Sequence, residues 1–156
     1  MSAGPNAAIA PREGERPLSE ETYHRPNLDE YFMSVMEATS ARATCDRGRS
    51  AAIIVVDGHI VSTGYVGAPA GLPHCDDVGH MMRVVVDPKS GKQSEHCVRT
   101  VHAEQNAICQ AAKLGHAVKG GTLYCRMEPC HVCAMLIVNC GIQRVVPGVG
   151  PPIGVV

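Results

Sequence analysis

His102-Ala103-Glu104 and the later stretch Pro129-Cys130-His131-Val132-Cys133 decide the fold, because each opens a segment with the apolar spacing of an amphipathic helix. The spacing predicts helices over residues 101–113 and 130–139, and a proline suits the start of the second one. Histidine and cysteine side chains are ligands that zinc prefers. The sequence therefore predicts a zinc site with His102, Cys130 and Cys133 as its ligands.

Three protein ligands leave the fourth position of a tetrahedral zinc ion to water, which then ionises near neutral pH. Glu104 follows His102 by two residues and is not needed as a ligand. The metal-bound water could attack the electron-poor carbon of an amidine-like ring in a substrate. Glu104 is predicted to take a proton from the water, protonate a nitrogen of that ring and assist the loss of ammonia. Helix starts favour anions, so the thiolates of Cys130 and Cys133 are expected to be stabilised before metal arrives. The pattern indicates a hydrolytic site.

Other kinds of site explain the same residues less completely. A closed structural zinc site needs a fourth ligand near the three, and a redox Cys-x-x-Cys pair leaves His102 and Glu104 unexplained. An inactive regulatory zinc protein has no need of the uncoordinated Glu104.

The composition is that of a small protein with little attraction for nucleic acid. The chain has 156 residues, of which 45% are hydrophobic, and this suffices for one domain with one core. Lys and Arg number 14 against 15 Asp and Glu, which gives a net charge of −1. One Phe, four Tyr and no Trp leave few rings on which single strands could stack. A nucleic-acid editing enzyme is therefore disfavoured.

Cysteine usage favours a reducing, cytoplasmic compartment. The chain has eight cysteines but shows no signal peptide and no apolar stretch long enough to span a membrane. In that setting clustered Cys and His indicate metal sites or buried thiols. Cys109, Cys125 and Cys140 are expected to be packing residues.

Periodicity divides the chain into a flexible arm (1–26), one enzymatic domain (27–147) and a Pro/Gly-rich tail (148–156). Within the domain, Asn27 is predicted to cap the first helix, and Asp57-Gly58 is predicted to join two strands as a hairpin. The alternation of elements indicates an α/β fold, a three-layer α-β-α arrangement with a mixed sheet. The other predicted elements are a helix over 28–41, strands over 51–56, 60–66, 122–125 and 143–146, and a long loop over 67–99 with room for a short helix.

From about residue 28 to residue 146, the chain resembles the deoxycytidylate (dCMP) deaminase family of the cytidine deaminase-like superfamily. The H-x-E…P-C-x-x-C spacing is the known signature of zinc nucleobase deaminases. Further motifs carry the resemblance to this family in particular: residues 64–71, which resemble its substrate loop, His74-Cys75-Asp76-Asp77, and His96-Cys97-Val98-Arg99-Thr100.

The resemblance implies hydrolysis of dCMP to dUMP and ammonia. It makes His102, Cys130 and Cys133 the zinc ligands and Glu104 the acid/base. The backbone of Ala103 would meet the pyrimidine carbonyl, and Tyr65 and Val66 belong to the substrate loop. The family continues beyond the last predicted strand, so the fold is expected to be truncated after its fourth strand. The resemblance also implies a homo-oligomer.

Departures from the family pattern bear on the substrate. The family loop carries Asn where this chain has Val66, which cannot hydrogen-bond a sugar. Arg126 and Arg99 are candidates for binding a phosphate or carboxylate. A different free nucleobase, nucleoside or nucleotide is therefore the alternative substrate.

Some members of the family hold a second, structural zinc ion, and the matching positions here begin with Cys45 and Cys75. His96, Cys97 and His80 lie in the same long loop as Cys75 and could complete four ligands. Cys45, Cys75, His96 and Cys97 are the predicted second set.

Overall fold

A computed structural model describes residues 24–86, 90–149 and 153–154 of the chain. Its elements follow the order α-β-β-α-β-β-α-β-α-β-β, and five of the strands form one mixed sheet in the order β2-β1-β5-β6-β7. Neighbouring strands of this sheet are antiparallel except for the parallel pair β5 and β6. The strands of this sheet are β1 (Ala51–Val56), β2 (His59–Tyr65), β5 (Thr122–Cys125), β6 (Arg144–Pro147) and β7 (Ile153–Gly154).

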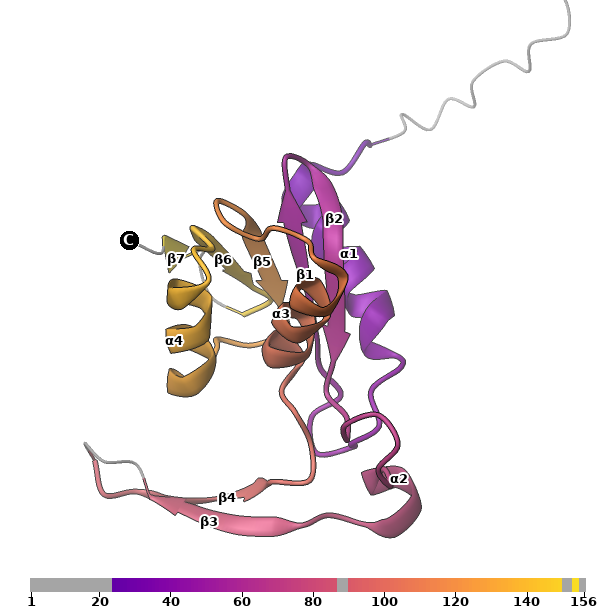
Figure 1. Cartoon of the computed structure of the whole chain (residues 1–156), viewed down its shortest axis with the longest axis vertical. Coiled ribbons are helices and arrows are strands. Elements are labelled where there is room, and N and C mark those ends of the chain that lie inside the picture. The colour runs from indigo at the N-terminus through magenta and orange to yellow at the C-terminus, as the bar shows by residue number, and fades with distance from the viewer. Residues whose placement is uncertain (1–23, 87–89, 150–152, 155–156) are drawn as a thin grey trace, which may run out of the picture.

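Helices cover both faces of the sheet, which confirms the predicted three-layer α/β fold (Figure 1). Helix α1 (Leu28–Ser40) packs on one face, and α3 (Ala103–Leu114) and α4 (His131–Asn139) pack on the other. Successive strand residues point to opposite faces. On β1, Ile53 therefore joins the core beneath α1, and Ile54 joins the core beneath α3 and α4.

The start of α1 confirms the predicted cap. The Asn27 side chain accepts a hydrogen bond from the Glu30 N–H at 2.9 Å, and the Glu30 carboxylate accepts one from the Asn27 N–H at 2.8 Å. This reciprocal pair satisfies two N–H groups that the helix itself cannot.

Asp29 in the first turn of α1 joins that helix to the sheet. Its carboxylate accepts hydrogen bonds from Arg144 on β6 and from the Tyr124 hydroxyl on β5, each at 2.8 Å. The Arg144 hydrogen bond, opposed by burial and helped by Tyr124, lowers the pKa of Asp29 to about 2. The carboxylate therefore stays ionised in the folded chain at pH values where it is protonated in the unfolded chain.

We expect Asp29→Asn to lower the free energy of unfolding at pH 7 by about 1 kcal/mol, after allowance for screening of this partly exposed pair. Because the folded pKa lies below the unfolded value of 3.8, the contribution is complete above about pH 5 and fades as pH falls toward 2. Urea unfolding of both proteins across this range measures the difference. A difference that grows on acidification would contradict the assignment.

The segment between β2 and α3 differs from the predicted long loop. The short helix exists as α2 (Cys75–Val78), but β3 (Met82–Val86) and β4 (Gln93–Cys97) also form a separate two-stranded antiparallel ribbon. Figure 1 shows this ribbon extending away from the body. The valines at 84–86, followed by Asp, Pro and Gly at positions 87, 88 and 91, residue types common in turns, were the sequence signal for a hairpin.

The end of the chain also differs from prediction, because the sheet continues past its fourth strand. The two residues of β7 pair with Arg144 and Val145 along the edge of β6. The predicted arm at 1–26 lies almost wholly outside the described residues, as does most of the tail at 148–156. The division into arm, domain and tail therefore stays a prediction. Among the described helices, none combines the length and apolar character needed to cross a membrane.

Candidate active site

The predicted zinc ligands come together where two helices begin. His102 directly precedes α3, and Cys130 directly precedes α4, which contains Cys133 in its first turn. The connection from β5 to α4 brings both cysteines to the His102 ring, since β5 ends at Cys125. The His102 Nδ1 lies 3.6 Å from the Cys130 Sγ and 3.5 Å from the Cys133 Sγ.

These separations fit one metal ion. Zn–S bonds of about 2.3 Å and Zn–N bonds of about 2.0–2.1 Å at tetrahedral angles place sulfur and nitrogen about 3.6 Å apart. The ligand atoms of all three side chains lie within 4.8 Å of one another. The sequence spacing thus identified three side chains that fold into one group of suitable donors.

Glu104 lies beside this group without belonging to it. Its side chain is buried, and its Oε2 is 3.7 Å from the Cys133 Sγ. Since α3 places Glu104 in its first turn, the carboxylate lines the same pocket as His102 and Cys130. This position is that of a proton-transfer group next to a metal-bound reactant.

The prediction that the helix start stabilises the thiolate is wrong for Cys133. Burial, followed by the nearby charge of Glu104, raises the pKa of Cys133 well above the ordinary value for a thiol. The helix start is therefore too weak to offset the loss of hydration. Without metal this thiol is protonated, so metal binding must displace its proton.

Gly64 on β2 permits the close approach that positions α3. A Cβ atom at this residue would lie 2.3 Å from the Ala107 nitrogen and 2.4 Å from the Ala103 oxygen, both of which are backbone atoms of α3. Beside it, the Ser62 hydroxyl donates a hydrogen bond to the Ala107 carbonyl at 2.6 Å. The first turn of α3, which carries Glu104, thus rests directly on the backbone of Gly64, where no side chain separates the helix from the strand.

We expect Gly64→Ala to destabilise the protein by about 3 kcal/mol or more, because the helix backbone cannot move aside within a packed core. Urea unfolding measures the loss. Gly154→Ala is the matched control, since a Cβ there meets open space. Equal stability of the two variants would contradict the close contact.

A pocket of about 350 Å³ opens beside this group and is lined by His102, Glu104 and Cys130, while Cys133 lies buried behind it. Of the predicted substrate contacts, Val66 and Ala103 line it, but Tyr65 and Arg126 do not. Tyr65 packs against the core beneath α1, on the other face of the sheet. The described lining residues are Cys45, Arg47, Gly48, Ser50, Val66, Glu95, His96, Cys97, Thr100, His102, Ala103, Glu104, Met127, Glu128 and Cys130.

The two predicted anion-binding arginines are engaged elsewhere. Arg126 donates to the Arg49 carbonyl at 2.6 Å, and Arg99 donates to the Gly79 carbonyl at 3.0 Å. The arginine that lines the pocket is Arg47, which is not among the residues predicted from the sequence. Its position two residues after Cys45 was the available signal.

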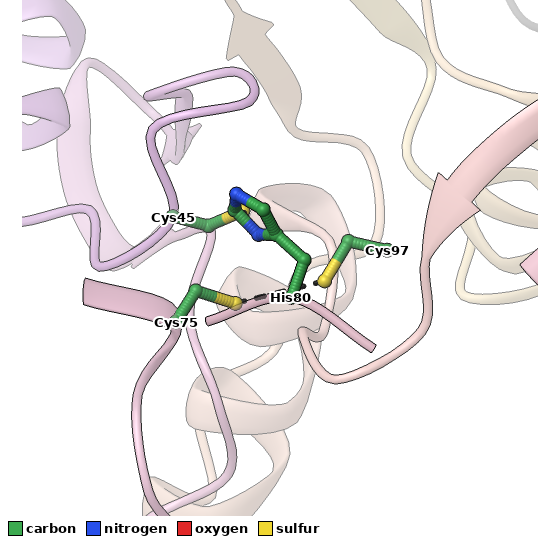
Figure 2. A group of neighbouring side chains, drawn as sticks. All are labelled: Cys45, Cys75, His80 and Cys97. Carbon is green, nitrogen blue, oxygen red and sulfur yellow. Dashed lines mark hydrogen bonds between the residues drawn. The ribbon is translucent and has the colours of Figure 1, made fainter. Parts of the chain in front are cut away.

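Cys45, Cys75, His80 and Cys97 form a second group whose ligand atoms also lie within 4.8 Å of one another (Figure 2). The Cys75 and Cys97 sulfurs are 3.6 Å apart, and the Cys45 Sγ is 3.7 Å from the His80 Nδ1. The prediction of His96 in this set is wrong. His96 precedes Cys97 on β4, so its side chain points to the opposite face of the ribbon, where its Nε2 lies 2.9 Å from the Ser94 hydroxyl.

The remaining cysteines differ in burial. Cys125 is buried and Cys140 is half-buried, as expected of packing residues, but Cys109 is exposed on α3. All eight cysteines are described, and all are free of disulfide bonds.

Comparison with known proteins gives one consistent result. Residues 26–149 match the family model described as the cytidine and deoxycytidylate deaminase zinc-binding region. The deoxycytidylate deaminase of Mycobacterium phage D29 is 39% identical over 124 residues, which cover 78% of this chain and 94% of that one. ComE operon protein 2 of Bacillus subtilis is 37% identical over 121 residues, or 78% of this chain and 59% of that one.

The structural comparison agrees with the sequence comparison. The crystal structure of dCMP deaminase from cyanophage S-TIM5 in complex with dCMP and dUMP superposes with a TM-score of 0.62. The two chains are 28% identical, and the match covers 80% of this chain and 83% of that one.

Proposed function

The chain belongs to the cytidine and deoxycytidylate deaminase zinc-binding family, and from that premise we propose that it is a zinc-dependent enzyme that hydrolyses dCMP to dUMP and ammonia. The observation that carries the proposal is the arrangement of His102, Cys130 and Cys133 around one point, with the buried Glu104 beside them and facing the pocket. Such a three-ligand site leaves room for a reactant, whereas a closed four-ligand site does not. The deoxycytidylate deaminase of phage D29 supports dCMP as the substrate.

His102, Cys130 and Cys133 would hold the zinc ion, which would lower the pKa of a water molecule and so supply the nucleophile at neutral pH. Glu104 would accept one proton from that water and transfer it to N3 of the cytosine ring. After the water oxygen has bonded to C4, Glu104 would take the second proton of that oxygen and pass it to the amino group, which leaves as ammonia when the C4–N4 bond breaks. The backbone at Ala103, at the start of α3, faces the pyrimidine carbonyl. Val66 borders the sugar and gives it an apolar neighbour, since its side chain has no hydrogen-bonding group.

A substrate panel tests the proposal. The zinc-loaded protein is incubated with cytosine and adenine bases, nucleosides and nucleotides, and ammonia release is measured against the Glu104→Gln variant. Turnover confined to dCMP supports the proposal. Preference for another compound would assign the same chemistry to a different substrate, and absence of ammonia with every compound would overturn the enzymatic function.

The proposal includes a second, structural zinc ion held by Cys45, Cys75, His80 and Cys97. Three sulfurs and one nitrogen at the separations given above suit a closed tetrahedral site. The His80 Nε2 lies 3.0 Å from the Asp46 carboxylate, which would orient the ring so that Nδ1 faces the metal. Burial raises the pKa of Cys97, but hydrogen bonds from the backbone of Arg99 and Met81 and from Cys75 and His80 outweigh it and lower that pKa to about 6.

We expect two zinc ions per chain in the wild-type protein and one in Cys75→Ser, because loss of one of four ligands weakens a structural site severely. Metal analysis after dialysis against a weak chelator measures the ratio. Cys109→Ser, which changes an exposed cysteine outside both groups, is the control. An unchanged metal content in Cys75→Ser would contradict the second site.

Self-association is the last part of the proposal. Val132, Met135 and Val138 on α4 are each about half exposed, so the helix presents an apolar face that the described part of the chain leaves uncovered. Faces of this kind mark interaction surfaces. Light scattering at several protein concentrations tests for a homo-oligomer.

We also place the enzyme in a reducing compartment such as the cytoplasm, because cysteines must be reduced to bind zinc.

A further inference from the structure

A nucleotide substrate requires the pocket to recognise a phosphate group. The described lining includes Glu95 and Glu128, whose carboxylates repel a phosphate, so a nearby cation must offset them. Arg47 is the arginine in this lining, and the lining contains no lysine. Arginine is always charged and can bind phosphate oxygens through two N–H groups at once.

Arg47 has a defined position although its side chain is exposed. Its Nη2 donates a hydrogen bond to the Glu95 carbonyl on β4 at 3.1 Å. This contact uses one of the five N–H donors of the guanidinium and draws it toward the ribbon side of the pocket. The partner is a backbone carbonyl, so the positive charge of Arg47 is not neutralised by this bond.

The group formed by Cys45, Cys75, His80 and Cys97 includes a residue close in sequence to each partner of the Arg47–Glu95 hydrogen bond. Cys45 lies two residues before Arg47, and Cys97 lies two residues after Glu95. Cys45 and Cys97 both line the pocket, whereas their companions Cys75 and His80 do not. A metal bound to the group would therefore join two pocket walls that are far apart in the sequence.

We propose that Arg47 is the residue that selects a phosphorylated substrate, and that the Cys45, Cys75, His80 and Cys97 centre positions it by fixing the two segments that meet at the Arg47–Glu95 hydrogen bond. The inference rests on the proposed nucleotide deaminase function and deepens it. It assigns to the second centre a part in substrate recognition in addition to holding the fold.

The first experiment compares Arg47→Gln with the wild-type protein. Binding of dUMP and of deoxyuridine is measured by calorimetry, and kcat/KM is measured for dCMP and deoxycytidine. We expect the variant to bind dUMP about 10- to 100-fold more weakly, since it loses charge-assisted hydrogen bonds. Values for the two compounds without phosphate should stay within about twofold of wild type. Arg83→Gln removes the same charge from an exposed position on β3 outside the pocket lining, and it should bind dUMP normally.

Two results of this experiment would overturn the role of Arg47. Unchanged dUMP binding would show that Arg47 does not meet the phosphate. Equal losses for dUMP and deoxyuridine would show that Arg47 shapes the pocket in general. Partial recovery of dUMP binding in Arg47→Lys would support recognition by charge.

The second experiment combines Arg47→Gln with Cys75→Ser, which disturbs the metal centre without touching the pocket. If the centre acts by positioning Arg47, Cys75→Ser alone weakens dUMP binding selectively, and the double variant is no weaker than Arg47→Gln. Additive losses, or normal dUMP binding by Cys75→Ser, would overturn the positioning role. Asp46→Ala, which keeps all four ligands but removes the partner of His80, replaces Cys75→Ser if that protein does not fold.

Failure of the proposal can be distinguished from failure of the proposed function. If wild-type protein releases ammonia from dCMP and Arg47→Gln does so equally well, the deaminase function stands and the role of Arg47 falls. If wild-type protein acts on no cytosine compound, the function itself is wrong.

Discussion

Glu104→Gln is expected to keep the full zinc content of the wild-type protein and to lose dCMP turnover by about 10²- to 10⁴-fold, the usual contribution of a general acid/base. The amide has almost the size of the carboxylate, so the first turn of α3 remains packed beside Cys133. It cannot accept the proton of water or return one to the substrate at neutral pH. Steady-state ammonia release and metal analysis on the same sample measure both quantities.

The matched control is Glu37→Gln, which makes the same change at an exposed position on α1. Its turnover should equal that of the wild type. Substantial activity in Glu104→Gln would remove Glu104 from proton transfer. Loss of zinc together with activity would instead indicate that the carboxylate is needed to hold the metal.

Local signals in the sequence predicted the parts of the site that lie close together in the chain. The His-x-Glu and Cys-x-x-Cys spacings each place their side chains within one helical turn, so α3 and α4 could be expected with their ligands. The Asn27 cap and the two strands joined by Asp57-Gly58 were equally local. These elements agree with the structure to within a few residues at their ends.

The features of the site that the sequence did not predict depend on contacts between segments that are distant in the sequence. Arg126 follows β5 closely enough to suggest a role at the site, but its side chain bonds to the Arg49 carbonyl on another segment. His96 is absent from the second group because the pairing of the β3–β4 ribbon turns its side chain away from that of Cys97, while His80, which lies just before the ribbon, takes the fourth position. Neither the pairing of that ribbon nor the approach of residues 45–47 to it follows from periodicity, because both depend on tertiary packing.

Burial explains the remaining difference between prediction and structure, which concerns the pKa of the Cys133 thiol. A helix start favours a thiolate by a modest amount, but Cys133 is fully enclosed by the core, and desolvation of a buried charge is the larger effect. The sequence places Cys133 in the first turn of α4 and says nothing about how deeply that turn is buried. The proton that its thiol retains is displaced only when metal binds.

Cys133→Ser is expected to abolish dCMP turnover and to reduce the zinc content by one ion per chain. The thiolate is one of three ligands, and the remaining pair of His102 and Cys130 cannot hold zinc against a chelator. Zinc at about a thousandfold above its dissociation constant stabilises the folded state by about 4 kcal/mol, so the variant should lose up to this amount. Metal analysis and urea unfolding with and without added zinc measure the two effects.

This variant and Cys75→Ser separate the two centres, because each changes one cysteine of one group and both can be compared with Cys109→Ser. Cys133→Ser should keep the second zinc and lose all turnover at any dCMP concentration, since the reacting water has no metal to activate it. Cys75→Ser should keep the first zinc and recover much of its turnover at saturating dCMP, since only phosphate recognition is weakened. If both variants lost both metal ions, the two groups would fold as one unit, and neither role could be assigned to a single centre.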